Sequence, residues 1–78
     1  MFIKVTRVTK EGEKTRTLVN SDKILCLFDL TKVSLDNSKP YEKAGAKTVI
    51  ILDALTTGAQ EYRLYVTDTM DDIIKINE

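Results

Sequence analysis

The chain of 78 residues has no histidine, no tryptophan, one cysteine and one proline. Without histidine there is no imidazole base, no Ser-His-Asp or Cys-His pair and no histidine-ligated metal. The single Cys26 can form neither an internal disulfide nor a Cys-x-x-Cys zinc site. These absences remove most familiar catalytic chemistry, so we expect no catalytic residue, no metal and no cofactor.

Long apolar runs are also absent. No run approaches the roughly 18–20 residues of a membrane helix. The first residues lack the apolar region of a signal peptide. Together with the lone thiol, this pattern predicts a cytoplasmic protein without membrane insertion.

Charge of one sign is not in excess, because 12 Lys and Arg balance 12 Asp and Glu. A neutral chain argues against wholesale nucleic-acid binding. The charges are unevenly placed, however: residues 1–47 carry ten cations and six anions, and residues 48–78 carry two and six. A locally basic face therefore remains compatible with the neutral total.

The length predicts a single domain, residues 1–78. Cores of this size are marginal, and small domains often gain stability from disulfides, metals or oligomerisation. Since the first two are excluded, oligomerisation gains weight.

The abundant residues are Val, Ile and Thr, which favour strands. Hydrophobic patterning predicts strands at residues 2–9, 14–19, 23–35, 48–54 and 60–67. Turns are expected at Gly12 and at residues 20–22, and a hairpin loop is expected over residues 56–59. A longer polar loop is expected over residues 36–47.

The densest apolar run is residues 24–28, and its lack of alternation favours a strand buried on both faces, with Cys26 inside. A helix is the competing interpretation of this run, because Leu is a good helix former. In residues 60–67 the alternation places Tyr62 in the core and Tyr65 on the opposite face.

After residue 67 the period changes to that of a helix, with Met70, Ile73 and Ile74 on one side. The fold class is therefore α+β, mainly β: a five-stranded antiparallel meander with a short C-terminal helix. A curled, barrel-like form of the sheet stays open as an alternative.

The acidic residues Asp68, Asp71 and Asp72 surround the start of this helix. Oxygen ligands suit Mg²⁺ or Ca²⁺, but neither EF-hand spacing nor an accompanying glycine is present. Capping and the helix dipole explain all three residues, so no metal site is predicted.

Basic residues on the first two strands form the candidate binding set, with two tyrosines that offer rings for stacking. The set is Lys4, Arg7, Lys14, Arg16, Tyr41 and Tyr65. A solvated sheet face is the competing interpretation.

The apolar strands and the helix carry more apolar surface than one thin sheet easily covers. The excess either lies inside a curved sheet or forms an interface. The candidate interface residues are Leu25, Leu27, Ile50, Leu52, Met70, Ile73 and Ile74.

The order of these segments resembles the FlbD-like family of small bacterial proteins, whose genes lie with motility functions. Residues 3–8 resemble the first strand of that family, and residues 18–24 are similar to its "LNPDLI" segment through Asn20, Asp22 and Ile24. Residues 48–52, Gly58 and residues 62–66 are similar to its "TVITL…G…YVV" hairpin. The helix from Asp71 to Ile76 is similar to its terminal "EEVIEKI". The resemblance implies a shared small fold and brings no catalytic residue.

Two functions remain. The first is a non-enzymatic interaction protein that self-associates, binds a protein partner, or does both. The alternative is a binder of nucleic acid or of a small phosphorylated ligand, through a basic sheet face or a pocket between subunits, as in a phage-type inhibitor. An enzyme ranks third, because its acid–base chemistry would rest on Asp, Glu, Lys or Tyr alone.

Overall fold

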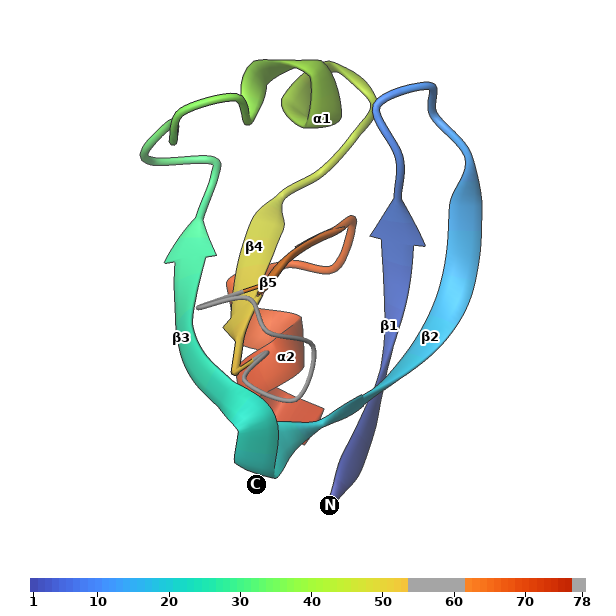
Figure 1. Cartoon of the computed structure of the whole chain (residues 1–78), viewed down its shortest axis with the longest axis vertical. Coiled ribbons are helices and arrows are strands. Elements are labelled where there is room, and N and C mark those ends of the chain that lie inside the picture. Colours follow the sequence, from blue (N-terminus) through green and yellow to red (C-terminus); the bar gives the residue numbers. More distant parts are fainter. Residues whose placement is uncertain (54–61, 77–78) are drawn as a thin grey trace.

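The computed structural model describes residues 1–53 and 62–76, which form a mainly β fold with a short C-terminal helix (Figure 1). The strands are β1 (Phe2–Val8), β2 (Lys14–Asn20), β3 (Ile24–Asp29), β4 (Thr48–Leu52) and β5 (Tyr62–Val66). The helices are the 3₁₀ helix η1 (Ser21–Lys23), α1 (Lys39–Lys43) and α2 (Met70–Ile76). The predicted five antiparallel strands and terminal helix are confirmed, and the predicted hairpin loop at residues 56–59 lies outside the described residues.

The strands form one sheet in the order β2-β1-β5-β4-β3, with antiparallel pairing throughout. A meander would keep the strands in chain order. Here β1 lies beside β5 in the centre, and the consecutive strands β2 and β3 are the two edges. The predicted meander order is therefore wrong at this point. Among the described strands no pairing closes β2 onto β3, so the barrel-like alternative is not supported.

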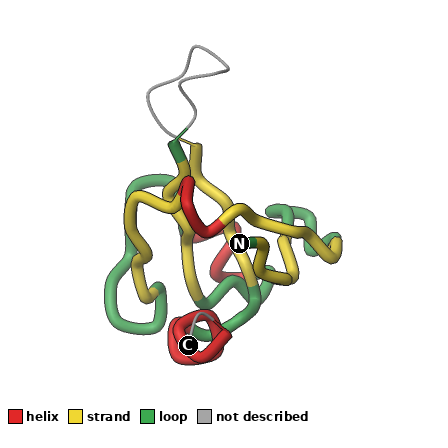
Figure 2. The backbone as a smooth tube through the Cα atoms, turned by 90° about the horizontal axis from the view of Figure 1, so that it is seen from below, coloured by secondary structure: helices red, strands yellow, loops and turns green. Residues whose placement is uncertain are grey.

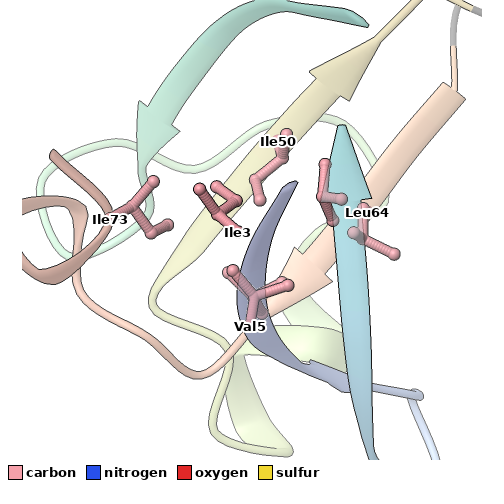
Figure 3. Packing of buried hydrophobic residues seen from close by; sticks show 7 residues of the cluster. Ile3, Val5, Ile50, Leu64 and Ile73 are labelled. Atoms are coloured by element: carbon pink, nitrogen blue, oxygen red, sulfur yellow. The ribbon is translucent and has the colours of Figure 1, made fainter. Parts of the chain in front are cut away.

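One core cluster lies on the sheet face that α2 covers. It comprises Ile3, Val5, Val19, Ile50, Leu64, Val66 and Ile73 (Figure 3). Ile73 has no exposed surface and brings α2 onto β1 and β3, as its helical spacing predicted. Figure 2 shows α2 beside the strands when the molecule is seen from below.

A second cluster lies on the opposite face, beneath the segment that joins β3 to β4. Its buried members are Val8, Leu30, Ala46, Val49, Ile51 and Tyr65. Alternate residues of β4 enter the two clusters, so β4 is buried on both faces. Apolar contacts on both faces explain why its run is continuous rather than alternating.

The segment predicted as a loop over residues 36–47 contains the short helix α1, at the opposite end of the molecule from the N-terminus (Figure 1). Ser38 is its N-cap residue and Pro40 lies in its first turn, where a missing N–H costs nothing. The prediction of irregular backbone here is thus wrong for residues 39–43.

Strand β3 ends at Asp29 rather than continuing to residue 35. The Asp29 carboxylate accepts hydrogen bonds from the Thr31 N–H and hydroxyl, and its carbonyl accepts from the N–H groups of Lys32 and Val33 at 3.1 Å each. These bonds fold residues 29–33 into a turn, so the predicted strand over residues 30–35 is wrong.

The apolar run of β3 is not buried on both faces. Because β3 is an edge strand, Leu25 is 60% exposed and Cys26 is exposed as well. The core position predicted for Cys26 is therefore wrong. Within residues 1–53 and 62–76, no helix is long and apolar enough to cross a membrane.

Candidate functional site

The cations of the β1–β2 hairpin divide between its two faces. Lys4 lies opposite Leu18, and Arg16 lies opposite Thr6. Residues directly opposite each other in an antiparallel pair share a face, and successive residues alternate. The outer hairpin face therefore holds Phe2, Lys4, Lys14, Arg16 and Leu18.

Two large apolar side chains on the outer hairpin face are open to solvent. Phe2 is 66% exposed and Leu18 is 62% exposed. Leu18 is a diagonal neighbour of Phe2 in the register, within reach of an aromatic side chain. Lys4 and Arg16 beside them are also exposed, and the strand residues of this face include no carboxylate. The face combines two apolar side chains at the end away from the turn with positive charge along the rest of the hairpin.

Arg7 points to the other face, so the four predicted cations do not form one stripe. It lines an open groove of about 440 Å³. The groove lies between β2 and the paired strands β4 and β5, and Lys23, Asp53 and Tyr62 also line it. Val19, Leu52 and Leu64 give the groove an apolar part. Its size falls in the range of small-molecule sites.

The two tyrosines predicted for binding stack on each other. The rings of Tyr41 on α1 and Tyr65 on β5 are 3.8 Å apart at their centroids and 5° from parallel. Tyr65 is buried and Tyr41 is half-buried, so the pair attaches α1 to the sheet. Arg63 Nη1 donates to the Asp36 carbonyl at 2.9 Å, and it lies 3.5 Å from the Tyr65 hydroxyl. Tyr65 shares its cluster with Val8, which lies opposite Lys14 on the same face of the sheet as the outer hairpin residues.

The burial of the tyrosines in β5 differs from the prediction. Tyr62 is 46% exposed, whereas Tyr65 is only 7% exposed. Alternation indicated the reverse, because it treats one face of the strand as solvated. Residues 30–46 cover that second face, and Tyr41 supplies the ring on which Tyr65 stacks.

Two carboxylates have shifted pKa values, and local hydrogen bonds cause both. The hydroxyl of Ser38, followed by that of Ser34, lowers the pKa of Glu42. Ser38 is fully buried and lies 2.6 Å from Glu42 Oε2. Thr31 lowers the pKa of Asp29 through its hydroxyl and its N–H. Both groups stabilise the polar segment around α1 and the end of β3.

The acidic residues near α2 have different structural positions. Asp68 Oδ2 accepts from the Thr6 N–H at 2.7 Å, and Thr69 Oγ1 accepts from the Asp72 N–H at 3.1 Å. Thr69 is thus the capping residue, while Asp71 and Asp72 lie exposed in the first turn. Among the described residues, no group of three potential ligands is placed to hold a metal ion.

The predicted interface residues do not lie on one surface. Leu25 and Ile74 are exposed, Leu27, Leu52 and Met70 are half-buried, and Ile50 and Ile73 have no exposed surface. Ile50 and Ile73 therefore belong to the core of this chain. Phe2 and Leu18 were missed, although their alternation with buried neighbours in the two strands could have placed them beside Lys4 and Arg16.

No protein-family model, curated protein or solved structure matches the chain. The resemblance to the FlbD-like family remains a prediction.

Proposed function

We propose that the chain is a non-enzymatic interaction module that binds a partner protein through the outer hairpin face. The observation that carries this proposal is the exposure of Phe2 and Leu18 together on that face. Large apolar side chains that gather on a surface support a docking function, because burying them against a partner is favourable. Aromatic residues in particular supply much of the energy of protein interfaces.

The charge of the same face specifies the partner. Lys4 lies directly opposite Leu18, Arg16 follows on the same face, and Lys14 lies further toward the hairpin turn. A partner with apolar anchors and carboxylates at the rim complements this arrangement, and the charges speed its approach. The proposed partner is therefore an acidic protein surface or peptide.

Two further observations are consistent with this function. The shifted pKa values of Asp29 and Glu42 have causes in local turns rather than in a cleft, so they give acid–base catalysis no support. The exposed free thiol of Cys26 suits a reducing compartment, which supports the cytoplasm as the place of action.

A displayed library of acidic peptides that contain aromatic and aliphatic residues tests the proposal. Peptides that bind the chain should lose more than about tenfold in affinity with Leu18→Ser, which corresponds to about 1.4 kcal/mol. Leu25→Ser is the matched control, since Leu25 is 60% exposed on the opposite edge strand. Equal binding by wild type and Leu18→Ser would rule out this face.

A second function is favoured by the groove beside Arg7. The groove of about 440 Å³ has two cations against the one carboxylate of Asp53, an apolar part and a tyrosine, which suit a small ligand with a phosphate and a flat apolar part. Thermal-shift measurements with mononucleotides at low salt test it, and Arg7→Gln should remove any shift. A gel shift at low salt tests nucleic acid in the same way, because electrostatic binding is strongest there.

A further inference from the structure

The two edges of the sheet differ in charge. Strand β2 carries Lys14 and Arg16, which hinder the addition of another strand. Residues 24–28 of β3 carry no charge, and Leu25 and Phe28 are 60% and 38% exposed. Natural sheets rarely leave an apolar edge strand unprotected, because it invites pairing with another chain. Of the two edges, the one at β3 is therefore the more open to pairing with a strand from another chain.

The backbone of β3 is paired on one side. Its partner is β4, with a register shift between Ile24 and Cys26 and regular pairing from Cys26 to Asp29, and no other described strand pairs with it. In an antiparallel ladder the N–H and C=O groups of alternate residues point away from the partner. These outward groups of β3 can form a second ladder with another strand.

We propose that the occupant of this edge is β3 of a second copy of the chain, paired antiparallel about a two-fold axis. A two-fold contact between identical edges closes with two copies. Pairing of β2 with β3 would be head-to-tail, would expose a new edge with every copy added, and would not stop at a dimer.

The charges at the two ends of β3 complement each other in this arrangement. Antiparallel pairing brings the start of one strand beside the end of the other. Lys23 precedes β3 and is exposed, and Asp29 ends it. Thr31 keeps the pKa of Asp29 low, so this carboxylate is charged at neutral pH. Asp22, the carboxylate next to Lys23 in the sequence, forms an ion pair with the N-terminal ammonium, at 3.6 Å from its nitrogen.

The apolar residues between these charges face one another in the same pairing. Leu25, Cys26 and Phe28 of one copy lie beside the corresponding segment of the other, which reduces their exposed area. An antiparallel pair of β2 strands would instead set Lys14 and Arg16 of each copy beside Asn20 and Leu18 of the other, with no carboxylate in either strand to pair with them. Charge therefore favours β3 over β2.

This dimer uses a different edge from the outer hairpin face, so it adds to the proposed function and does not rest on it. Both hairpins stay free in the dimer, at the far ends of the joined sheet. Each copy retains its surface for an acidic partner. The two proposals can accordingly fail separately.

Sedimentation equilibrium from micromolar to millimolar concentration tests the dimer. The wild type should reach the mass of two chains, and Leu25→Lys should weaken dimerisation more than about tenfold. Leu18→Lys is the control, because Leu18 is 62% exposed on the other edge strand. This control should dimerise like the wild type while losing the acidic peptides.

A second variant and a second measurement guard against misfolding. Lys23→Glu places like charges at both ends of the paired strands and should also weaken the dimer. Hydrogen exchange of the β3 amides in the wild type should slow as concentration rises. A wild type that stays monomeric at millimolar concentration overturns the proposal, as does a folded Leu25→Lys variant that dimerises unchanged. If Leu18→Lys weakens dimerisation as much as Leu25→Lys does, the interface lies on the hairpin and not on β3.

Discussion

The side chain of Asp68 extends the β1–β5 ladder, because its Oδ2 accepts the Thr6 N–H at 2.7 Å across 62 residues of sequence. The Thr67 N–H donates to the Thr6 carbonyl at 2.9 Å, next to the pair Arg7 and Val66. The Asp68 carbonyl also accepts the Thr48 hydroxyl at 2.8 Å. Asp68 thus ties β1 and β4 to the end of β5, where α2 begins.

We expect Asp68→Ala to lower the free energy of unfolding by about 1.5–3 kcal/mol, the range for hydrogen bonds to charged groups. Asp68→Asn should lose less, because its amide oxygen can still accept from Thr6. Urea unfolding measures both variants. Asp71→Ala is the control, since Asp71 is exposed in the first turn of α2 and contributes only about 0.3–1 kcal/mol through the helix dipole. Equal effects of the Asp68→Ala and Asp71→Ala variants would contradict the role of this bond.

The pKa of Glu42 should rise toward its ordinary value in Ser38→Ala, because the Ser38 hydroxyl is the largest cause of its lowering. The rise should be partial, since Ser34 also bonds to Glu42 at 3.0 Å. A titration followed by NMR of the Glu42 carboxyl carbon measures this. Thr31→Val, which removes the hydroxyl donor to Asp29, should leave the pKa of Glu42 unchanged.

The lowered pKa of Glu42 also predicts how the stability of the fold depends on pH. A carboxyl whose folded pKa lies below its unfolded pKa stabilises the fold above the unfolded value, and the contribution disappears as pH falls through the folded pKa. Both Glu42 and Asp29 have lowered pKa values, so the free energy of unfolding should fall on acidification below the ordinary carboxyl range. In Ser38→Ala this fall should be shallower. An unchanged slope in that variant would show that Glu42 contributes nothing to it.

Local sequence pattern predicted where most strands lie but not their order. The strand at residues 2–9 was predicted, and its alternation agrees with the structure, in which Ile3 and Val5 lie on one face and Val8 on the other. The apolar runs of β3 and β4 look alike in sequence, yet one is an edge strand and the other is central. Their difference arises from the sheet order, in which β1 pairs with β5. Contacts between residues this far apart in sequence, such as Thr6 and Asp68, leave no local signal.

The candidate surfaces show the same limit. Period-2 alternation could identify Lys4 and Arg16 as exposed, but only the register of β1 and β2 shows that Arg7 lies on the other face. The helix α1 was missed because the segment 36–47 is polar and contains Pro40, a composition typical of a loop. The sequence did contain a signal for it, since Ser38 two residues before a proline is typical of a helix start.

The stack of Tyr41 on Tyr65 should be a measurable part of stability. Tyr41→Ala removes a half-buried ring and its partner contact, and it should cost about 2 kcal/mol in the free energy of unfolding. Tyr41→Phe keeps the ring and should stay within about 0.5 kcal/mol of the wild type. Thermal unfolding followed by near-ultraviolet circular dichroism reports both stability and the aromatic environment. A loss as large in Tyr41→Phe as in Tyr41→Ala would assign the effect to the hydroxyl rather than to stacking.

The thiol of Cys26 should react in the native protein. It is exposed on β3, although its apolar neighbours favoured a core position. Because the chain has one cysteine, the release of thionitrobenzoate from Ellman's reagent reports this residue alone. At low micromolar concentration we expect rates similar with and without urea, since access does not require unfolding. At millimolar concentration the native rate should fall if β3 pairs with a second copy, while Leu25→Lys should keep the fast rate at both concentrations. A thiol that reacts only in urea at every concentration would contradict the exposed position of Cys26 and, with it, the open edge at β3.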